Sequence, residues 1–129
     1  MLIIVYDKLP ERIKLLLTNY ECDKSKFVCG LKTAFKLNYG TPYMWIVVAK
    51  DSLVLCNTLK QPPGGLWALY NYSELNSIRF KKDIVDNFSI EILEVNPNKP
   101  IINLPMSRTT NVEDIKELIK CCNGLVNKE

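Results

Sequence analysis

The sequence contains no histidine among its 129 residues, and this absence removes the commonest general base and the commonest metal ligand. A cysteine nucleophile would therefore lack its usual partner. There is no Gly-x-Ser-x-Gly motif, and the proline- and glycine-rich segment 61–65 lacks the lysine of a phosphate-binding loop. We therefore expect a protein that is not an enzyme, with no catalytic residues and no cofactor.

Long apolar runs are absent as well. Residues 1–6 form the apolar run at the N-terminus, and Asp7 and Lys8 end it. A signal peptide has a basic start and a longer apolar core, and a membrane helix has about eighteen or more apolar residues. These features predict a soluble, cytoplasmic protein. Residues 1–6 fit either a short strand or an extended arm, which could pair with this domain or with another molecule.

The cysteines lack the spacing of a zinc or redox motif. The chain has five of them, an odd number, and no two form a Cys-x-x-Cys pair. An odd number fits a reducing compartment better than a disulfide framework, and zinc requires four suitable ligands. We expect these thiols to pack as small apolar groups and to hold no metal.

A strong charge of either sign is also missing. The chain has 17 basic and 14 acidic residues, which give a net charge of +3. This excess is too small for the basic surface of a nucleic-acid-binding domain. We therefore expect no nucleic-acid partner.

The residues that are present predict one domain, residues 1–129, with a helix near each end. In the first helix, at about 7–20, Ile13, Leu16, Leu17 and Tyr20 share one face, and Leu15 widens the apolar stripe enough to predict packing against a sheet. The second helix, at about 111–123, has an apolar stripe at Val112, Ile115, Leu118, Ile119 and Cys122. Thr110 or Asn111 can cap this helix, and Gly124 can end it.

Between the two helices the apolar pattern changes to that of short strands. Alternating or continuous apolar runs are separated by turns rich in glycine, proline and asparagine. The expected strands are 27–38, 43–49, 53–58, 66–72, 77–80, 88–93 and 101–104. Short connections predict antiparallel pairing rather than parallel crossover units.

Two segments of this region resemble the bacterial pleckstrin-homology-like domain family. The apolar strand, polar turn and leucine-rich return strand at 45–55 are similar to a hairpin of that family, as is the aromatic, polar, acidic and aliphatic segment at 72–78. The resemblance implies an α+β fold. In it, an antiparallel barrel or two orthogonal sheets, at about 27–104, are capped by the C-terminal helix, with an extra N-terminal helix.

The resemblance also implies a class of function. Domains of this family bind phosphoinositides, peptides or proteins, or serve in assembly. We expect a non-enzymatic binding or assembly module whose partner is another protein or a second copy of the chain, bound through barrel edges or loops. The alternative is a peripheral membrane module that binds anionic lipid headgroups through a weak basic rim.

A small set of residues could carry such binding. Lys24, Lys26, Lys32 and Lys36 could form a basic strip that contacts a phosphate or headgroup, or could be the solvated face of a strand. Trp67, beside the proline- and glycine-rich segment, could be a surface anchor or a packed core residue. A second basic cluster at 79–82 is followed by Asp83 and Asp86, so we expect a turn with local ion pairs there.

Overall fold

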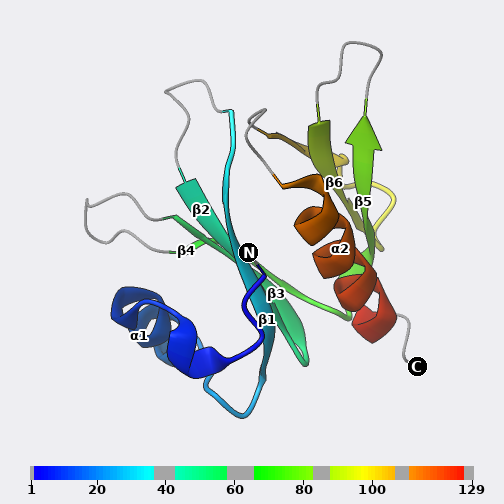
Figure 1. Cartoon of the computed structure of the whole chain (residues 1–129). Coiled ribbons are helices and arrows are strands. Elements are labelled where there is room, and N and C mark those ends of the chain that lie inside the picture. Colours follow the sequence, from blue (N-terminus) through cyan, green and yellow to red (C-terminus); the bar gives the residue numbers. More distant parts are fainter. Residues whose placement is uncertain (1, 37–42, 58–65, 83–87, 107–110, 127–129) are drawn as a thin grey trace.

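The computed structural model describes residues 2–36, 43–57, 66–82, 88–106 and 111–126, and within these ranges the strands form two antiparallel sheets (Figure 1). The first sheet has the order β1-β2-β3-β4, and its strands are Phe27–Ala34, Tyr43–Ala49, Ser52–Asn57 and Leu66–Asn71. The second has the order β5-β6-β7, with strands Leu75–Lys82, Phe88–Glu94 and Ile102–Pro105. The helices are α1, Glu11–Asn19, and α2, Val112–Val126, and a 3-10 turn, Tyr6–Lys8, precedes α1.

The two sheets meet at one corner and do not close into a barrel. At this corner Phe35 forms an antiparallel bridge with Met106, and the Lys36 backbone N–H donates to the Pro105 carbonyl at 2.9 Å. In the described residues β4 pairs only with β3, and β5 only with β6. Two sheets with a C-terminal helix are therefore confirmed, but the closed barrel is wrong. Helix α2 occupies the open side instead, where it contacts β5, β1 and β2.

The main core lies between the sheets and α2. Strand β2 faces this core through Met44, Ile46 and Val48. Other strands of both sheets and helix α2 supply the remaining buried side chains of this core. These include Phe35, Leu55, Ile78, Ile90, Ile92, Ile115, Leu118 and Cys122. The predicted apolar stripe of the C-terminal helix is thus confirmed, because four of its five members are buried.

Helix α1 covers the other face of the first sheet and forms a second apolar cluster there (Figure 1). Ile13 and Leu17 of α1 are buried against Trp45, Val47 and Val54. The expected packing of α1 on a sheet is confirmed, but the contribution of Leu15 is wrong, because its side chain is 66% exposed. Leu15 is two residues from both Ile13 and Leu17, and two residues on a helix differ by about 200° in direction.

The ends of α2 differ in part from the prediction. Asn111 caps the helix, since its Oδ1 accepts a hydrogen bond from the Asp114 backbone N–H at 3.2 Å, whereas Thr110 lies outside the described residues. Gly124 does not end the helix, which continues to Val126. Leu125 and Val126 pack against the main core, and these contacts stabilise helical residues beyond the glycine.

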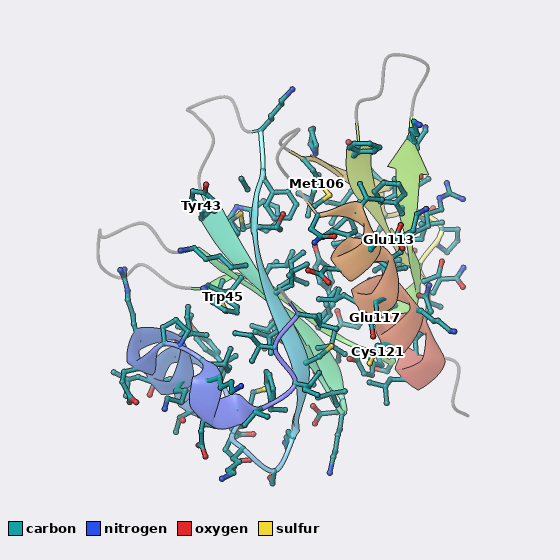
Figure 2. All side chains as sticks on the ribbon, in the orientation of Figure 1. Tyr43, Trp45, Met106, Glu113, Glu117 and Cys121 are labelled. Carbon is teal, nitrogen blue, oxygen red and sulfur yellow. The ribbon has the colours of Figure 1, made fainter. Side chains whose placement is uncertain are left out.

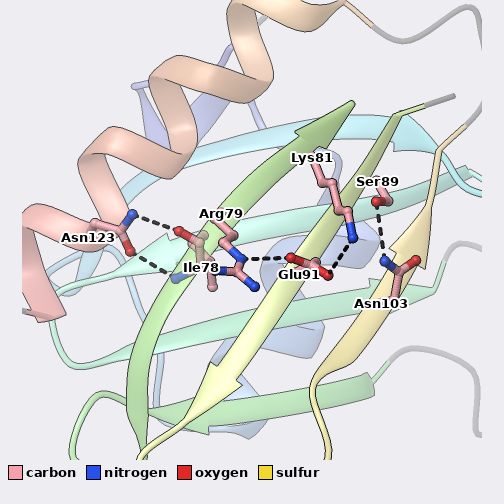
Figure 3. Close-up of polar contacts among 7 residues, drawn as sticks. All are labelled: Ile78, Arg79, Lys81, Ser89, Glu91, Asn103 and Asn123. Carbon is pink, nitrogen blue, oxygen red and sulfur yellow. Dashed lines mark hydrogen bonds and ion pairs between the residues drawn. The ribbon is translucent and has the colours of Figure 1, made fainter. Parts of the chain in front are cut away.

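Asn123 of α2 closes the outer edge of β5 (Figure 3). Its Oδ1 accepts a hydrogen bond from the Ile78 N–H at 2.9 Å, and its Nδ2 donates to the Ile78 carbonyl at 2.7 Å. One side-chain amide therefore replaces the backbone of a neighbouring strand. This pairing blocks strand addition at the middle of β5.

Replacing Asn123 with alanine is expected to lower the free energy of unfolding by about 2–3 kcal/mol, because two half-buried backbone groups of Ile78 lose their partner. The measurement is urea denaturation. Gly124→Ala is the matched control, because an added Cβ there meets no atom within 4 Å. Alanine is the better helix former, so this control should gain up to about 1 kcal/mol. Equal stability of Asn123→Ala and the wild type would show that the amide contributes nothing.

Candidate functional site

The four predicted lysines do not gather into one strip. Lys24 Nζ lies 3.2 Å from Asp7 Oδ2, and Lys26 Nζ lies 3.3 Å from Asp51 Oδ2. The hydrogen bond to Asp51 raises the pKa of Lys26. Both residues precede β1 and have a carboxylate partner, whereas Lys32 and Lys36 lie further along the chain. Only the latter two are near the surfaces described next.

An aromatic surface lies on the outer face of the first sheet, beyond the part that α1 covers (Figure 2). Tyr43, at the start of β2, is 53% exposed, and Lys32 Nζ lies 5.1 Å from the centroid of its ring. Trp45 continues this face toward α1 and is buried in the α1 cluster. Lys32 pairs with Trp45 in the register of β1 and β2, so the two side chains share this face.

Trp67 on β4 extends the same surface. The Trp67 side chain is 39% exposed. The pairing of β3 and β4 shifts at this residue: Leu55 pairs with Ala68 and Cys56 with Leu66, so Trp67 itself has no partner in the register. Leu69, two residues along, packs on the α1 cluster, which places Trp67 on the outer face. Only β3 separates β2 from β4, so their backbones are about 10 Å apart at the usual strand spacing. We call Lys32, Tyr43 and Trp67 the aromatic rim.

A second surface is a polar hollow of about 430 Å³ near the corner where the sheets meet. The ends of β1, β5, β6 and β7 contribute to it. It is lined by Lys36, Lys81, Phe88, Ser89, Asn103, Pro105 and Met106. Asn103 Nδ2 donates a hydrogen bond to Ser89 Oγ at 3.3 Å (Figure 3). Two ammonium groups, a hydroxyl and an amide therefore line one concave surface.

Two basic side chains beside this hollow form ion pairs with the buried carboxylate of Glu91 (Figure 3). Arg79 Nε lies 2.6 Å from Glu91 Oε1, and Lys81 Nζ lies 3.7 Å from Oε2. The hydrogen bond from Arg79 holds the pKa of Glu91 below its usual value, so the carboxylate stays charged at neutral pH. Among the described residues, one carboxylate is shared by two cations, and Lys36 adds a further positive charge to the lining of the hollow.

The second basic cluster is therefore not a turn. Arg79, Lys81 and Lys82 belong to β5, and Arg79 lies opposite Glu91 in the register of β5 and β6. Asp83 and Asp86, the predicted partners, lie outside the described residues. The alternation of 79 and 81 with Phe80 was a signal for a strand, but only the register shows that Glu91 is the partner.

In the described part of the chain we find neither a cluster of metal ligands nor an activated cysteine. No group of three or more Cys, Asp or Glu side chains is placed to hold a metal ion there. Four cysteines are buried, and burial raises the pKa of Cys22 to about 11 and those of Cys56 and Cys122 to about 12. These thiols are protonated at neutral pH and so are poor nucleophiles. None of the described helices is long and apolar enough to cross a membrane.

Neither a known family profile nor a curated protein matches the sequence. Solved structures do match. The DH/PH domains of human ARHGEF11, in a ternary complex with human RhoA and its inhibitor, have a TM-score of 0.58 at 14% identity, over 97% of this chain and 35% of that chain. The linker-DH/PH domains of p115-RhoGEF have a TM-score of 0.53 at 12% identity, over 81% of this chain and 30% of that chain.

A third structure, the DH/PH domains of PDZ-RhoGEF in complex with activated RhoA, has a TM-score of 0.53 at 10% identity. The chain spans about a third of the length of these proteins. At such low identity the likeness shows the fold alone. The pleckstrin-homology-like fold is thus confirmed, and a bacterial origin of the family stays a prediction.

Proposed function

We propose that the chain is a non-enzymatic binding module whose aromatic rim docks a protein partner. The observation that carries this proposal is the exposure of Tyr43 and Trp67 on a sheet face that α1 covers elsewhere. Large aromatic side chains contribute most of the binding energy at many protein interfaces, and here they lie next to an apolar layer. Lys32 over the Tyr43 ring adds a cation at the edge of the surface.

The comparisons support a protein as the partner. Two of the similar structures contain RhoA bound to DH/PH proteins. A second copy of this chain is the other protein that the rim could bind, and light scattering over a range of concentrations separates the two cases. A cytoplasmic location fits either partner and remains a prediction.

Trp67→Ala is expected to weaken partner binding by about thirtyfold, the effect of removing an interface aromatic worth about 2 kcal/mol. The measurement is affinity capture with quantitative mass spectrometry. Leu15→Ala is the control, because it removes an apolar side chain that is even more exposed than Trp67 and lies on α1 rather than on the rim. Proteins lost with Trp67→Ala and Tyr43→Ala but kept with Leu15→Ala would support the rim. Identical capture by all variants would contradict it, and an oligomer dispersed by Trp67→Ala would identify a second copy.

The polar hollow favours a second candidate function, which is binding of an anionic lipid headgroup. Lys36, which follows β1, and Lys81 of β5 both line the hollow, and the Ser89 hydroxyl can donate to a phosphate oxygen. This chemistry suits a phosphorylated headgroup. Lys24 and Lys26 each have a carboxylate partner of their own, whereas Lys81 shares the Glu91 carboxylate with Arg79.

Lys36→Glu with Lys81→Glu is expected to reduce binding to vesicles with anionic lipid at least tenfold, because two attractive charges become repulsive. Sedimentation with vesicles at low and high salt measures this, and salt should weaken wild-type binding steeply. Lys99→Glu is the control: it lies on the turn between β6 and β7, outside the lining of the hollow, and it changes the net charge by two units where the double variant changes it by four. If the wild type does not sediment at low salt, or if Lys99→Glu has the same effect, the hollow does not bind headgroups.

A further inference from the structure

Three cysteines and one tyrosine meet where α2 packs on β1. Cys29 belongs to β1, Cys121 and Cys122 are neighbours on α2, and Tyr72 directly follows β4. All four side chains belong to the main core or pack against it, and α2 contacts β1 directly. The fold therefore brings together thiols that are far apart in the chain.

The four groups form two hydrogen-bonded pairs. Burial raises the pKa of Cys29, and its hydrogen bond to Cys121 raises that pKa further, so the Cys29 thiol keeps its proton and is the donor. Cys122 is hydrogen-bonded to the Tyr72 hydroxyl. That hydroxyl donates its own proton to the Ala49 carbonyl, so the Cys122 thiol is the donor to Tyr72. Cys121 is therefore the thiol that contacts Cys29.

The two thiols of the first pair differ in their access to solvent. Cys29 is 2% exposed, whereas Cys121 is only half-buried. Cys121 lines a groove of about 580 Å³ between β1 and α2, together with Val28, the neighbour of Cys29. Figure 2 shows Cys121 near the C-terminal end of α2, on the side toward β1. A small reagent in this groove reaches Cys121 first.

We propose that Cys29 and Cys121 are a redox-active pair that a hydroperoxide converts to a disulfide. The Cys121 sulfur attacks the peroxide, an S–O bond forms as the O–O bond breaks, and the alcohol or water leaves with the thiol proton. The Cys29 sulfur then attacks the resulting sulfenic acid, an S–S bond forms as the S–O bond breaks, and water leaves with the Cys29 proton. The two thiols lose two electrons, and the peroxide gains them.

Contact between the two thiols makes this pair selective. Buried Cys29 is protonated and is a poor nucleophile toward reagents in solution. Its attack on Cys121 is intramolecular, however, and groups held in contact react as if they were at very high concentration. Cys121 and Cys122 are not expected to join, because neighbouring side chains on a helix differ by about 100° in direction.

The disulfide ties α2 covalently to the first sheet. In the reduced chain, α2 packs on β5, β1 and β2, and the Asn123 amide bonds to Ile78. A cross-link between residues so far apart in sequence restricts the unfolded chain strongly. Oxidation therefore holds α2 more firmly over the open side of the two sheets. This site is separate from the aromatic rim and does not depend on it.

The test treats the reduced full chain with hydrogen peroxide and maps its disulfides by mass spectrometry without reduction. Trypsin releases residues 27–32, in which Cys29 is the sole cysteine, and residues 121–128, which contain Cys121 and Cys122. We expect these two peptides to be linked, in at least about tenfold the yield of any other cysteine pair. Dithiothreitol should restore the thiols, and the oxidised chain should unfold at a urea concentration at least about 1 M higher.

Single substitutions identify the partner on α2. Cys121→Ala should abolish the link, whereas Cys122→Ala is the matched control and should keep it. In Cys29→Ala the second step is blocked, so the sulfenic acid of Cys121 should persist and react with dimedone at least about tenfold more than in the wild type. The map of the wild-type chain needs no substitution, so it tests the pair even if a variant does not fold.

Three results would overturn the inference. They are a map in which Cys29 stays reduced or joins another cysteine, disulfides only between separate chains, and an equal yield of the link in Cys121→Ala and the wild type. Trp67→Ala must leave the yield unchanged, because Trp67 lies on the outer face of the first sheet. Failure of the rim interaction and failure of the thiol pair are therefore distinguishable.

Discussion

Replacing Phe35 with alanine is expected to lower the free energy of unfolding by about 3–5 kcal/mol. The ring is fully buried in the main core, at the corner where the bridge to Met106 joins the two sheets. Removing it leaves a cavity at the one place where backbone hydrogen bonds join the described parts of the sheets. Because domains are typically stable by about 5–15 kcal/mol, the variant would be close to unfolded at 37 °C.

Urea denaturation followed by circular dichroism measures this effect. Tyr43→Ala is the control, because it removes an aromatic side chain from the same sheet at a position that is more than half exposed. It should cost less than about 1 kcal/mol. If both variants had the same stability, the corner would not be part of the cooperative core.

Leu17→Ala is expected to lower the free energy of unfolding by about 2–5 kcal/mol, although α1 has only nine residues. The Leu17 side chain is fully buried against the outer face of the first sheet, in the cluster that contains Trp45 and Val54. Strand β2 is buried on both faces, so losing the α1 layer exposes apolar surface of the central strands. We therefore expect helix α1 to contribute to the stability of the first sheet.

Leu15→Ala is the matched control and should change stability by less than about 0.5 kcal/mol, because this leucine faces solvent. Tryptophan fluorescence during urea denaturation reports directly on the cluster through the buried Trp45. If Leu17→Ala melted only α1, with the rest of the chain unfolding at the wild-type urea concentration, the helix would not belong to the cooperative unit.

Local patterns predicted the elements well. The apolar run at 43–49, the turn at 50–52 and the run at 53–58 predicted the hairpin of β2 and β3, and the structure pairs Val48 with Leu53 and Val47 with Val54 but starts β3 at Ser52. The helical stripe of α2 identified residues that are now buried. These predictions succeed because alternation and helical spacing reflect burial within one element.

The predictions that failed depend on contacts between elements. Leu15 was expected on the apolar stripe of α1, but it is exposed, because the width of a buried stripe depends on the surface that the helix packs against. Gly124 was expected to end α2, but the helix continues to Val126, because its end depends on the contacts of the residues that follow. Asn123 and Ile78 are 45 residues apart, and no pattern in either segment indicates that their polar groups bond. The same holds for Arg79 and Glu91, whose pairing follows from the register of two strands.

The amino-acid order by itself determined the helices, most strands, the division into apolar and polar faces and the absence of histidine-based chemistry. These properties depend on residue type and on spacings of two to four residues. Only the tertiary structure decided that the sheets remain open, that Lys36 and Lys81 share a hollow and that residues 2–5 lie on the edge of β1. Each of these joins groups far apart in the chain, and their proximity depends on how all the layers pack together.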